Sequence, residues 1–207
     1  MTLEAFRARR AASKREAILE RASEAFRTEG YARASMEAVA RAAHVSTATL
    51  YRYFESKAAL FEAVAGATMD RLQLEAAEAP EPALEMHRLA LAYARLLSQP
   101  ETRGMFRMVV AECGRDPVLA ERFYRAVKGR LSDLFVQAIR RGEAAGVYAV
   151  SLAHDQAAGQ LQGMIEHATL MRGLVLGDGV DTLSEVEAIA DQAFATWAAR
   201  WVRPAPS

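Results

Sequence analysis

The stretch GYARASMEAVARAAHVSTATLYRYFESKAALFEAV, residues 30–64, contains two short helical patterns joined by a turn of three to four residues. Ser35 and Ser46 stand where helix N-caps are expected, because a serine side chain can accept a hydrogen bond from a free amide of the first turn. Ala40 is small enough for the two helices to cross closely. His44 lies in the turn, where a positive φ angle must be tolerated, which glycine does more easily. The spacing therefore predicts a helix-turn-helix.

The second of these helices begins with short hydroxyl side chains and continues into tyrosines. Hydroxyls can approach base edges or phosphates, and the major groove of B-DNA admits one helix. Tyrosine hydroxyls can reach phosphates, and Lys57 would place a charge beside the free amides of the next helix. Ser46 is either a helix cap or a contact, and Arg52 either a phosphate contact or a solvated side chain. The residue types point to DNA contacts from Ser46, Thr47, Thr49, Tyr51, Arg52, Tyr53 and Lys57.

Positive charge is concentrated near the N-terminus. The chain carries 26 basic and 26 acidic side chains, so the net charge alone indicates no partner. Residues 1–66 hold 11 basic against 8 acidic side chains, and the first fifteen positions contain Arg7, Arg9, Arg10, Lys14 and Arg15. Such a segment is either an arm that contacts an anionic partner or a solvated charged tail.

Length and cysteine content narrow the class of protein. The 207 residues suffice for one large or two small domains with a hydrophobic core. A single cysteine excludes an intramolecular disulfide and a cysteine-based zinc site, and we predict neither a metal nor a cofactor. No apolar run approaches the length of a membrane span, and the first residues lack the apolar core of a signal peptide. We therefore expect a soluble cytoplasmic protein that has no membrane partner.

The whole chain reads as helical. Ala, Leu, Glu and Arg are plentiful, and no alternating run of β-branched residues is long enough for a strand. A capping box at residues 13–16 predicts the start of the first helix, and A-P-E-P at residues 79–82 predicts the end of the fourth. We predict an all-α fold of about nine helices, which follow Ser13, Ser35, Ser46 and Ser56 and then lie near 83–98, 101–114, 117–144, 152–175 and 183–202.

Residues 30–64 resemble the DNA-binding signature of the TetR/AcrR family of bacterial repressors. The family's T-L-Y-x-Y-F and S-K-x-x-L elements are both intact. His44 stands where the family usually has a turn glycine, and Ala48 stands where a glycine is frequent in the recognition helix. Residues 105–127 are similar to the C-terminal half of the AefR-like subgroup. The resemblance implies that the positions contacting DNA are Thr47, Ala48, Thr49, Tyr51, Tyr53 and Lys57.

This resemblance also implies a homodimer. Family members pair their last two helices into a four-helix bundle, and the dimer sets two recognition helices into successive major grooves of a palindromic operator. Two glycines on one face of the predicted helix 152–175 would permit a close approach, which would compensate for their cost to the helix. A broad apolar stripe on the last helix either joins this interface or packs within the chain. The expected interface residues are Gly159, Gly163, Phe194, Trp197 and Trp201.

The resemblance further implies a small-molecule site in the C-terminal half. Polar side chains and methionines alternate on one face of the predicted helix 152–175, which suits an adaptable pocket. The same side chains could instead be ordinary core, with Gln160 and His167 needing hydrogen-bond partners if buried. The expected lining of a site for a largely apolar effector is Met105, Phe106, Val109, Cys113, Phe123, Tyr124, Phe135, Gln160, Met164, His167 and Met171.

These features combine into a two-domain switch. Residues 1–58 would form a basic arm and a three-helix DNA-binding head, and residues 59–207 a larger helical domain for ligand binding and dimerisation. The helix near 56–78 would transmit ligand binding to the head. We predict a TetR-type repressor that a small molecule releases from DNA. Activation in place of repression stays open, as does a helical small-molecule- or partner-binding protein with degenerate DNA recognition.

An enzyme is not expected. None of the four histidines follows a glutamate at the spacing of a Glu-x-x-His di-iron site. The sequence also lacks the H-E-x-x-H, G-x-S-x-G and phosphate-loop motifs.

Overall fold

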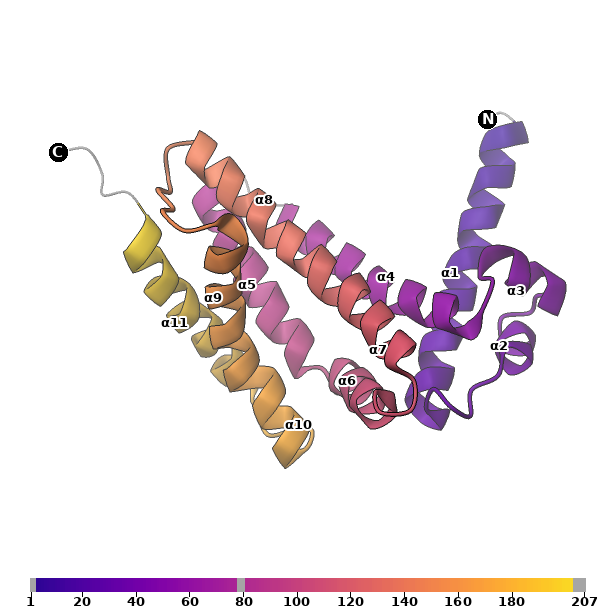
Figure 1. Ribbon diagram of the computed structural model, residues 1–207. Coiled ribbons are helices and arrows are strands. Elements are labelled where there is room, and N and C mark those ends of the chain that lie inside the picture. Colours follow the sequence, from indigo (N-terminus) through magenta and orange to yellow (C-terminus); the bar gives the residue numbers. More distant parts are fainter. Residues whose placement is uncertain (1–2, 78–80, 203–207) are drawn as a thin grey trace. The chain divides into compact units, whose positions relative to one another are not determined.

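Helices make up most of the protein. The computed structural model describes residues 3–77 and 81–202, and in these ranges the only β interaction is an isolated antiparallel bridge between Tyr148 and Val202 (Figure 1). The prediction of an all-α fold is confirmed. The elements are α1 (Leu3–Glu29), α2 (Met36–Ala42), α3 (Thr47–Tyr53), α4 (Lys57–Ala77), α5 (Pro82–Ser98), α6 (Pro100–Glu112), α7 (Pro117–Tyr124), η1 (Arg125–Gly129), α8 (Arg130–Ala144), α9 (His154–Glu166), η2 (His167–Met171), α10 (Arg172–Leu176) and α11 (Leu183–Trp201).

The first helix is longer than the sequence predicts. Ser13 lies inside α1, which begins at Leu3, so the predicted start at the capping box is wrong. The preceding residues LEAFRARRAA are nearly all strong helix formers, and the helix therefore continues through a serine that could have capped it. The basic segment is consequently part of α1.

Two of the predicted helices contain a π-helical turn. The predicted helix 117–144 is α7, η1 and α8 in succession, and the predicted helix 152–175 is α9, η2 and α10. A π turn accommodates an extra residue, which changes the face on which all later side chains lie. Such turns are rare, often mark functional positions, and have no signal in a hydrophobic period.

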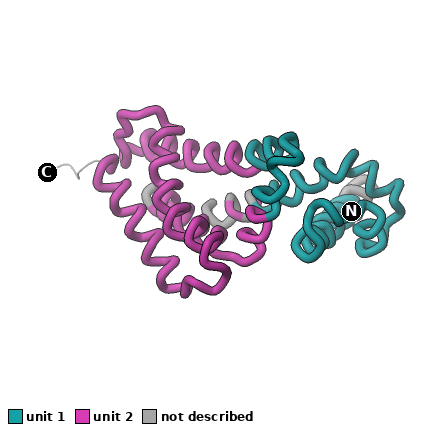
Figure 2. Tube along the Cα trace, turned by 60° about the horizontal axis from the view of Figure 1, so that its bottom comes forward, with its two compact units in different colours: residues 1–68, 108–126 teal, residues 69–107, 127–207 magenta. Residues whose placement is uncertain are grey.

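The chain folds into two compact units, which Figure 2 distinguishes by colour. Unit 1 comprises Met1–Thr68 and Met108–Ala126, and unit 2 comprises Met69–Arg107 and Val127–Ser207. The predicted boundary after residue 58 differs from this division, because unit 1 also takes in the start of α4, the end of α6 and all of α7.

The core of unit 1 is centred on aromatic rings. Phe61 of α4 meets Phe26 of α1 edge to face at 5.2 Å between ring centroids, and stacks on Phe123 of α7 at 5.8 Å. Tyr31, in the turn after α1, completes the group at 5.5 Å from Phe61. Edge-to-face and stacked arrangements suit the quadrupoles of the rings, and this packing fixes the helices that support α2 and α3.

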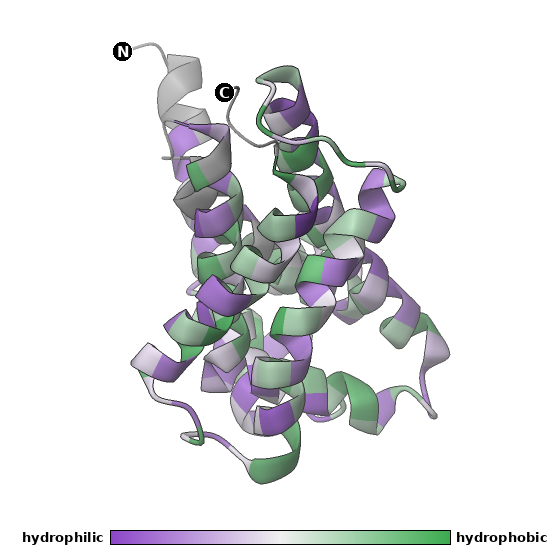
Figure 3. Cartoon of the chain, turned by 90° about the vertical axis from the view of Figure 1, so that its left-hand side faces the viewer, coloured by the Kyte–Doolittle hydropathy of each residue, from purple (hydrophilic) through white to green (hydrophobic). Residues whose placement is uncertain are grey.

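Unit 2 is a helical bundle in which α5, α8, α9 and α11 pack on one another. Hydrophilic and hydrophobic residues share the same helices in Figure 3, as amphipathic helices require. Trp197 of α11 is buried, where its Nε1 donates a hydrogen bond to the carbonyl of Ala157 at 2.8 Å and its ring meets Tyr148 edge to face. Within the described ranges no helix has the length and apolarity that a bilayer crossing demands.

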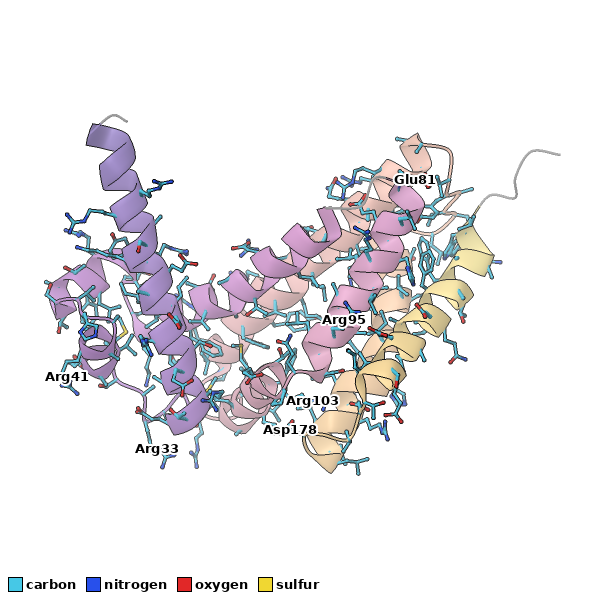
Figure 4. The ribbon with its side chains drawn as sticks, turned by 180° about the vertical axis from the view of Figure 1, so that it is seen from behind. Arg33, Arg41, Glu81, Arg95, Arg103 and Asp178 are labelled. Carbon is cyan, nitrogen blue, oxygen red and sulfur yellow. The ribbon has the colours of Figure 1, made fainter. Side chains whose placement is uncertain are left out.

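Two arginines of α6 hold the loop between α10 and α11 in unit 2. Arg103 is fully buried and pairs with Asp181, and its guanidinium also donates to the carbonyls of Leu97 and Thr169 at 3.1 Å each. One turn later, Arg107 pairs with Asp178 at 2.9 Å. Figure 4 shows Arg103 and Asp178 at the same end of the unit. The loop is therefore held by charged hydrogen bonds from α6.

Candidate DNA-binding face and effector region

The helix-turn-helix has the local geometry that the sequence predicts. Oγ of Ser35 accepts a hydrogen bond from the amide of Ala38 at 3.1 Å, and Oγ of Ser46 accepts one from the amide of Thr49 at 3.1 Å. His44 adopts a φ angle of 53°, the one positive φ at a non-glycine position in the described chain. Two capped helices and a left-handed turn residue thus fix the orientation of α3 against α2.

One face of α3 is buried and the other is exposed. Leu50 packs into unit 1, whereas Tyr51 keeps 45% of its surface exposed. Ser46 acts as the N-cap and shares a 2.8 Å hydrogen bond with the hydroxyl of Thr49, which is half-buried. The predicted contact positions on the exposed face are Ser46, Thr47, Ala48, Tyr51 and Arg52.

The end of α3 lies against α1. Tyr53 is half-buried, and its hydroxyl donates to the carbonyl of Ala11 at 3.4 Å. Arg15 lies over the ring of Phe54, 5.6 Å from its centroid. The exposed basic residues Arg9, Arg10 and Lys14 therefore belong to the part of α1 that borders α3. The side chain of Arg7 lies outside the described part.

The side chain of Lys57 is hydrogen-bonded within unit 1. Its ammonium donates to the carbonyls of Tyr31 at 2.7 Å, Ala32 at 3.2 Å and Ala34 at 3.2 Å. The same group lies 4.5 Å from the centroid of the Tyr31 ring, a cation–π distance. All three of its donors are used, so a phosphate would have to compete with these carbonyls for Lys57.

Two exposed arginines near the helix-turn-helix were not among the predicted residues. Arg41 lies in the last turn of α2, and Arg33 precedes α2 and donates to the carbonyl of Glu29 at 2.9 Å (Figure 4). A sequence signal existed, because both arginines lie within the residues that form the motif. Their charge adds to that of α1 and Arg52 on this unit.

The predicted effector-binding residues are divided between the two units. Val109 and Phe123 are buried in unit 1, where Cys113 and Tyr124 are exposed. In unit 2, Phe135 is buried in the core, the half-buried side chains are Met105, Phe106 and Met164, and the exposed ones are Gln160, His167 and Met171. The structure therefore does not gather this set around one point in either unit.

A different group of polar side chains occurs in unit 2. Tyr93, Lys128 and Glu166 interact directly, and Gln162 lies one turn before Glu166 on α9; we call these four residues the interior polar cluster. The hydroxyl of Tyr93, on α5, donates to Oε1 of Glu166 at 2.5 Å. Lys128 of η1 forms an ion pair with the same carboxylate. Burial raises the pKa of Tyr93 well above its usual range, and the negative charge of Glu166 raises it further. The phenol is thus kept protonated and able to donate.

Gln162 is the unsatisfied member of this cluster. It is only 5% exposed, and its Nε2 has no acceptor among the described residues. Sequence reasoning selected Gln160 instead, which lies two positions earlier and therefore on another side of α9. The signal that distinguishes the two is the run Ala157, Ala158, Leu161 and Ile165, whose helical spacing marks the buried side.

The predicted interface residues have two kinds of surroundings. Gly159 and Gly163 are exposed, and an added Cβ at either would meet no heavy atom of another described element within 4 Å. Phe194 is half-buried, 5.1 Å from the ring of His87 between centroids. Trp197 and Trp201 are buried within the chain, as the alternative of intrachain packing anticipates.

Comparisons with known proteins bear on both halves of the chain. Residues 18–64 match the family described as bacterial regulatory proteins, tetR family, and residues 84–203 match the AefR-like transcriptional repressor C-terminal domain. The HTH-type transcriptional regulator YhgD of Bacillus subtilis (strain 168) is 34% identical over 74 residues. That match spans 36% of this chain and only 39% of YhgD.

Solved structures share the fold over nearly the whole chain. A protein from Mesorhizobium loti MAFF303099 described as a TetR-family transcriptional regulator has a TM-score of 0.78 and 24% identity, and the match covers 94% of this chain and 99% of that one. The flavonoid-responsive regulator FrrA has a TM-score of 0.67 and 27% identity, with 93% and 98% covered. Because family matches account for the helix-turn-helix and for more than half of the chain, the protein belongs to the TetR family of transcriptional regulators.

Proposed function

We propose that the protein is a repressor that binds a palindromic operator as a homodimer and leaves it when a small molecule binds unit 2. The observation that carries this proposal is the exposed face of α3, held by two serine caps and the left-handed His44. Thr47, Ala48 and Tyr51 project from that face, where they can meet base edges and phosphates. Arg33, Arg41 and Arg52 add charge that favours the DNA backbone.

Selection of bound duplexes from a random DNA library tests the DNA-binding part of the proposal. The purified protein should recover a palindrome, and Tyr51→Ala should lose it. Tyr124→Ala is the matched control, because Tyr124 is another exposed tyrosine of unit 1 but lies on α7. Recovery of no preferred sequence by the wild type would contradict the proposal.

The glycine face of α9 supports a homodimer. A glycine inside a helix costs about 1 kcal/mol relative to alanine, and Gly159 and Gly163 have no neighbour from another element among the described residues that would require it. A second copy packed closely on this face supplies the reason. Gly163→Leu should therefore convert the dimer to a monomer in light scattering after gel filtration, whereas Gly129→Leu, at another open and exposed glycine, should not. Equal masses for Gly163→Leu and the wild type would rule out this interface.

An apolar effector is the class that we propose for unit 2. FrrA, which is similar over nearly its whole length, is described as flavonoid-responsive. Flavonoids are largely apolar aromatic molecules, in keeping with a helical bundle whose interior is mainly hydrophobic. Release of the selected duplex by an effector would support repression relieved by ligand, and an effector that tightens DNA binding would contradict it.

One observation favours a second candidate function. Lys57, a predicted phosphate contact, already has three carbonyl partners inside unit 1. These internal hydrogen bonds of Lys57 would fit a protein that binds small molecules but has lost DNA recognition. Such a protein would recover no sequence in the duplex selection.

A further inference from the structure

The interior polar cluster joins three segments of unit 2. Tyr93 belongs to α5, Lys128 to η1, and the remaining two members to α9. Because α9 is a regular α-helix as far as Glu166, Gln162 and Glu166 lie one turn apart on the same face. The two partners of the Glu166 carboxylate, Tyr93 and Lys128, therefore lie in the same region of the bundle as the amide of Gln162.

The Nε2 amide of Gln162 has donors to offer and no acceptor among the residues that the structure describes. Leaving a buried donor unpaired destabilises a protein, whereas an apolar side chain of similar size would carry no such cost. An acceptor that comes from outside the chain would account for a glutamine at this position.

The charges of the cluster select the kind of acceptor. Lys128 and Glu166 neutralise each other, and Tyr93 is held in its neutral form. An anionic or cationic ligand would leave a net charge in a region of low polarity, which is costly, whereas an uncharged oxygen would not. The side chains of Lys128 and Glu166 are 28% and 25% exposed, so the cluster extends from the interior of the bundle to its surface.

The surroundings indicate the rest of the ligand. Tyr93 packs edge to face on Phe135, which is fully buried, at 5.9 Å between ring centroids. Aromatic and aliphatic walls with few polar groups are typical of sites for apolar small molecules. The π turn η1 contains Lys128, and the π turn η2 directly follows Glu166. Such turns are often found at functional positions.

We infer that the interior polar cluster is the polar end of the effector site, and that the effector is an uncharged, largely apolar molecule whose carbonyl oxygen accepts a hydrogen bond from Nε2 of Gln162. This inference rests on the proposed function, because it assigns the chemistry of the ligand that unit 2 is proposed to bind. It places recognition on Gln162, not on the exposed row of Gln160, His167 and Met171.

The first test uses the ligand-free protein. Gln162→Leu removes an unpaired donor and should raise the Tm by about 2–4 °C. Gln160→Leu is the matched control, because it makes the same change at an exposed position of the same helix, and it should leave the Tm within about 1 °C. A lower Tm for Gln162→Leu would show that the amide has a structural partner and would overturn the inference.

The second test uses flavone and flavan, two uncharged probes with the same ring framework, of which only flavone carries a carbonyl. Calorimetric titration should show that flavone binds the wild type about tenfold more tightly than flavan. Gln162→Leu should bind both probes equally, whereas Gln160→Leu should discriminate between them as the wild type does. Equal affinities for the wild type, binding of neither probe, or tighter binding of a flavone carboxylate would each overturn the inference.

The duplex recovered by selection separates this inference from the proposed function. If the wild type recovers no duplex but distinguishes flavone from flavan, the regulator role fails and the effector site stands. If it recovers a palindrome but does not distinguish the probes, the regulator role stands and the inference fails.

Discussion

Arg103 and Asp181 form an ion pair whose two side chains are each only 1% exposed, in a unit whose core is mainly apolar. A buried pair of this kind adds little net stability relative to well-packed apolar residues. The loss of one partner, however, leaves the other charge buried and uncompensated, which is destabilising. Asp181 retains a second arginine, Arg172, at 2.6 Å, and Arg172 is partly exposed. The pair therefore fixes the position of the loop between α10 and α11 more than it stabilises the fold.

Arg103→Met should lower the free energy of unfolding by about 3 kcal/mol, near the lower end of the range for such losses because Arg172 still neutralises part of the charge. Urea denaturation followed by circular dichroism measures this change. The double variant Arg103→Met/Asp181→Leu should recover part of the loss. A double variant less stable than the single one would show that the two side chains do not act as a pair.

Gly173→Ala should destabilise the protein by about 2 kcal/mol, because the added Cβ would lie 2.0 Å from Nε of Arg103. Arg103 cannot move aside without losing its buried acceptors. Gly104→Ala is the control, since a Cβ there meets no heavy atom of another described element within 4 Å. It should be neutral or stabilising by up to about 1 kcal/mol in thermal denaturation. Similar effects of the two changes would contradict the close approach.

Lys57→Met should lower the free energy of unfolding of unit 1 by about 2 kcal/mol, because three carbonyls lose a charged donor. DNA affinity should fall through the altered support of α3. The slope of log affinity against log salt concentration should stay unchanged if Lys57 contacts no phosphate. A slope reduced by about one would instead assign Lys57 a phosphate contact.

Alkaline pH should destabilise unit 2 through its buried tyrosines. Burial raises the pKa of Tyr148 far above its usual range, and the nearby Glu85 raises it further, while Tyr93 shifts in the same direction. Unfolded tyrosines lose their protons near pH 10, so the unfolded state binds fewer protons than the folded state above that pH. The stability contributed by these neutral phenols is therefore complete below about pH 10 and is lost as the pH rises further.

Tyr148→Phe tests this expectation by urea denaturation between pH 8 and pH 11. The variant should be less stable than the wild type at pH 8, because the hydroxyl donates to the carbonyl of Pro82 at 3.1 Å. Its stability should then fall less steeply above pH 10. Parallel losses in the two proteins would mean that Tyr148 does not titrate on unfolding.

The helix-turn-helix could be predicted from the sequence because local rules determine it. Ser35 and Ser46 cap their helices as their positions indicate, and His44 takes the positive φ angle that the turn needs. Tertiary contacts determine the features that were missed. The carbonyls around Lys57 come from a turn more than twenty residues earlier, and no pattern near Lys57 announces them.

The C-terminal half was less predictable for a related reason. The bundle and its helices follow from hydrophobic spacing, but the choice between Gln160 and Gln162 depends on which side of α9 meets α5 and α8. Both residues are polar, and the alternation with methionines favoured the exposed one. The π turns were also invisible, because an inserted residue changes the hydrogen bonding of a helix without changing its composition.

The composition of unit 1 determines how the head could be transplanted. Its aromatic core needs Phe123, which stacks on Phe61. Phe123 lies more than sixty residues later in the sequence, beyond residues 69–107, which belong to unit 2. A chimera that borrows residues 1–68 alone would leave Phe61 facing a foreign surface. A graft intended to carry the DNA preference of this protein onto a relative should therefore include residues 108–126, so that both chain segments of unit 1 are transferred together.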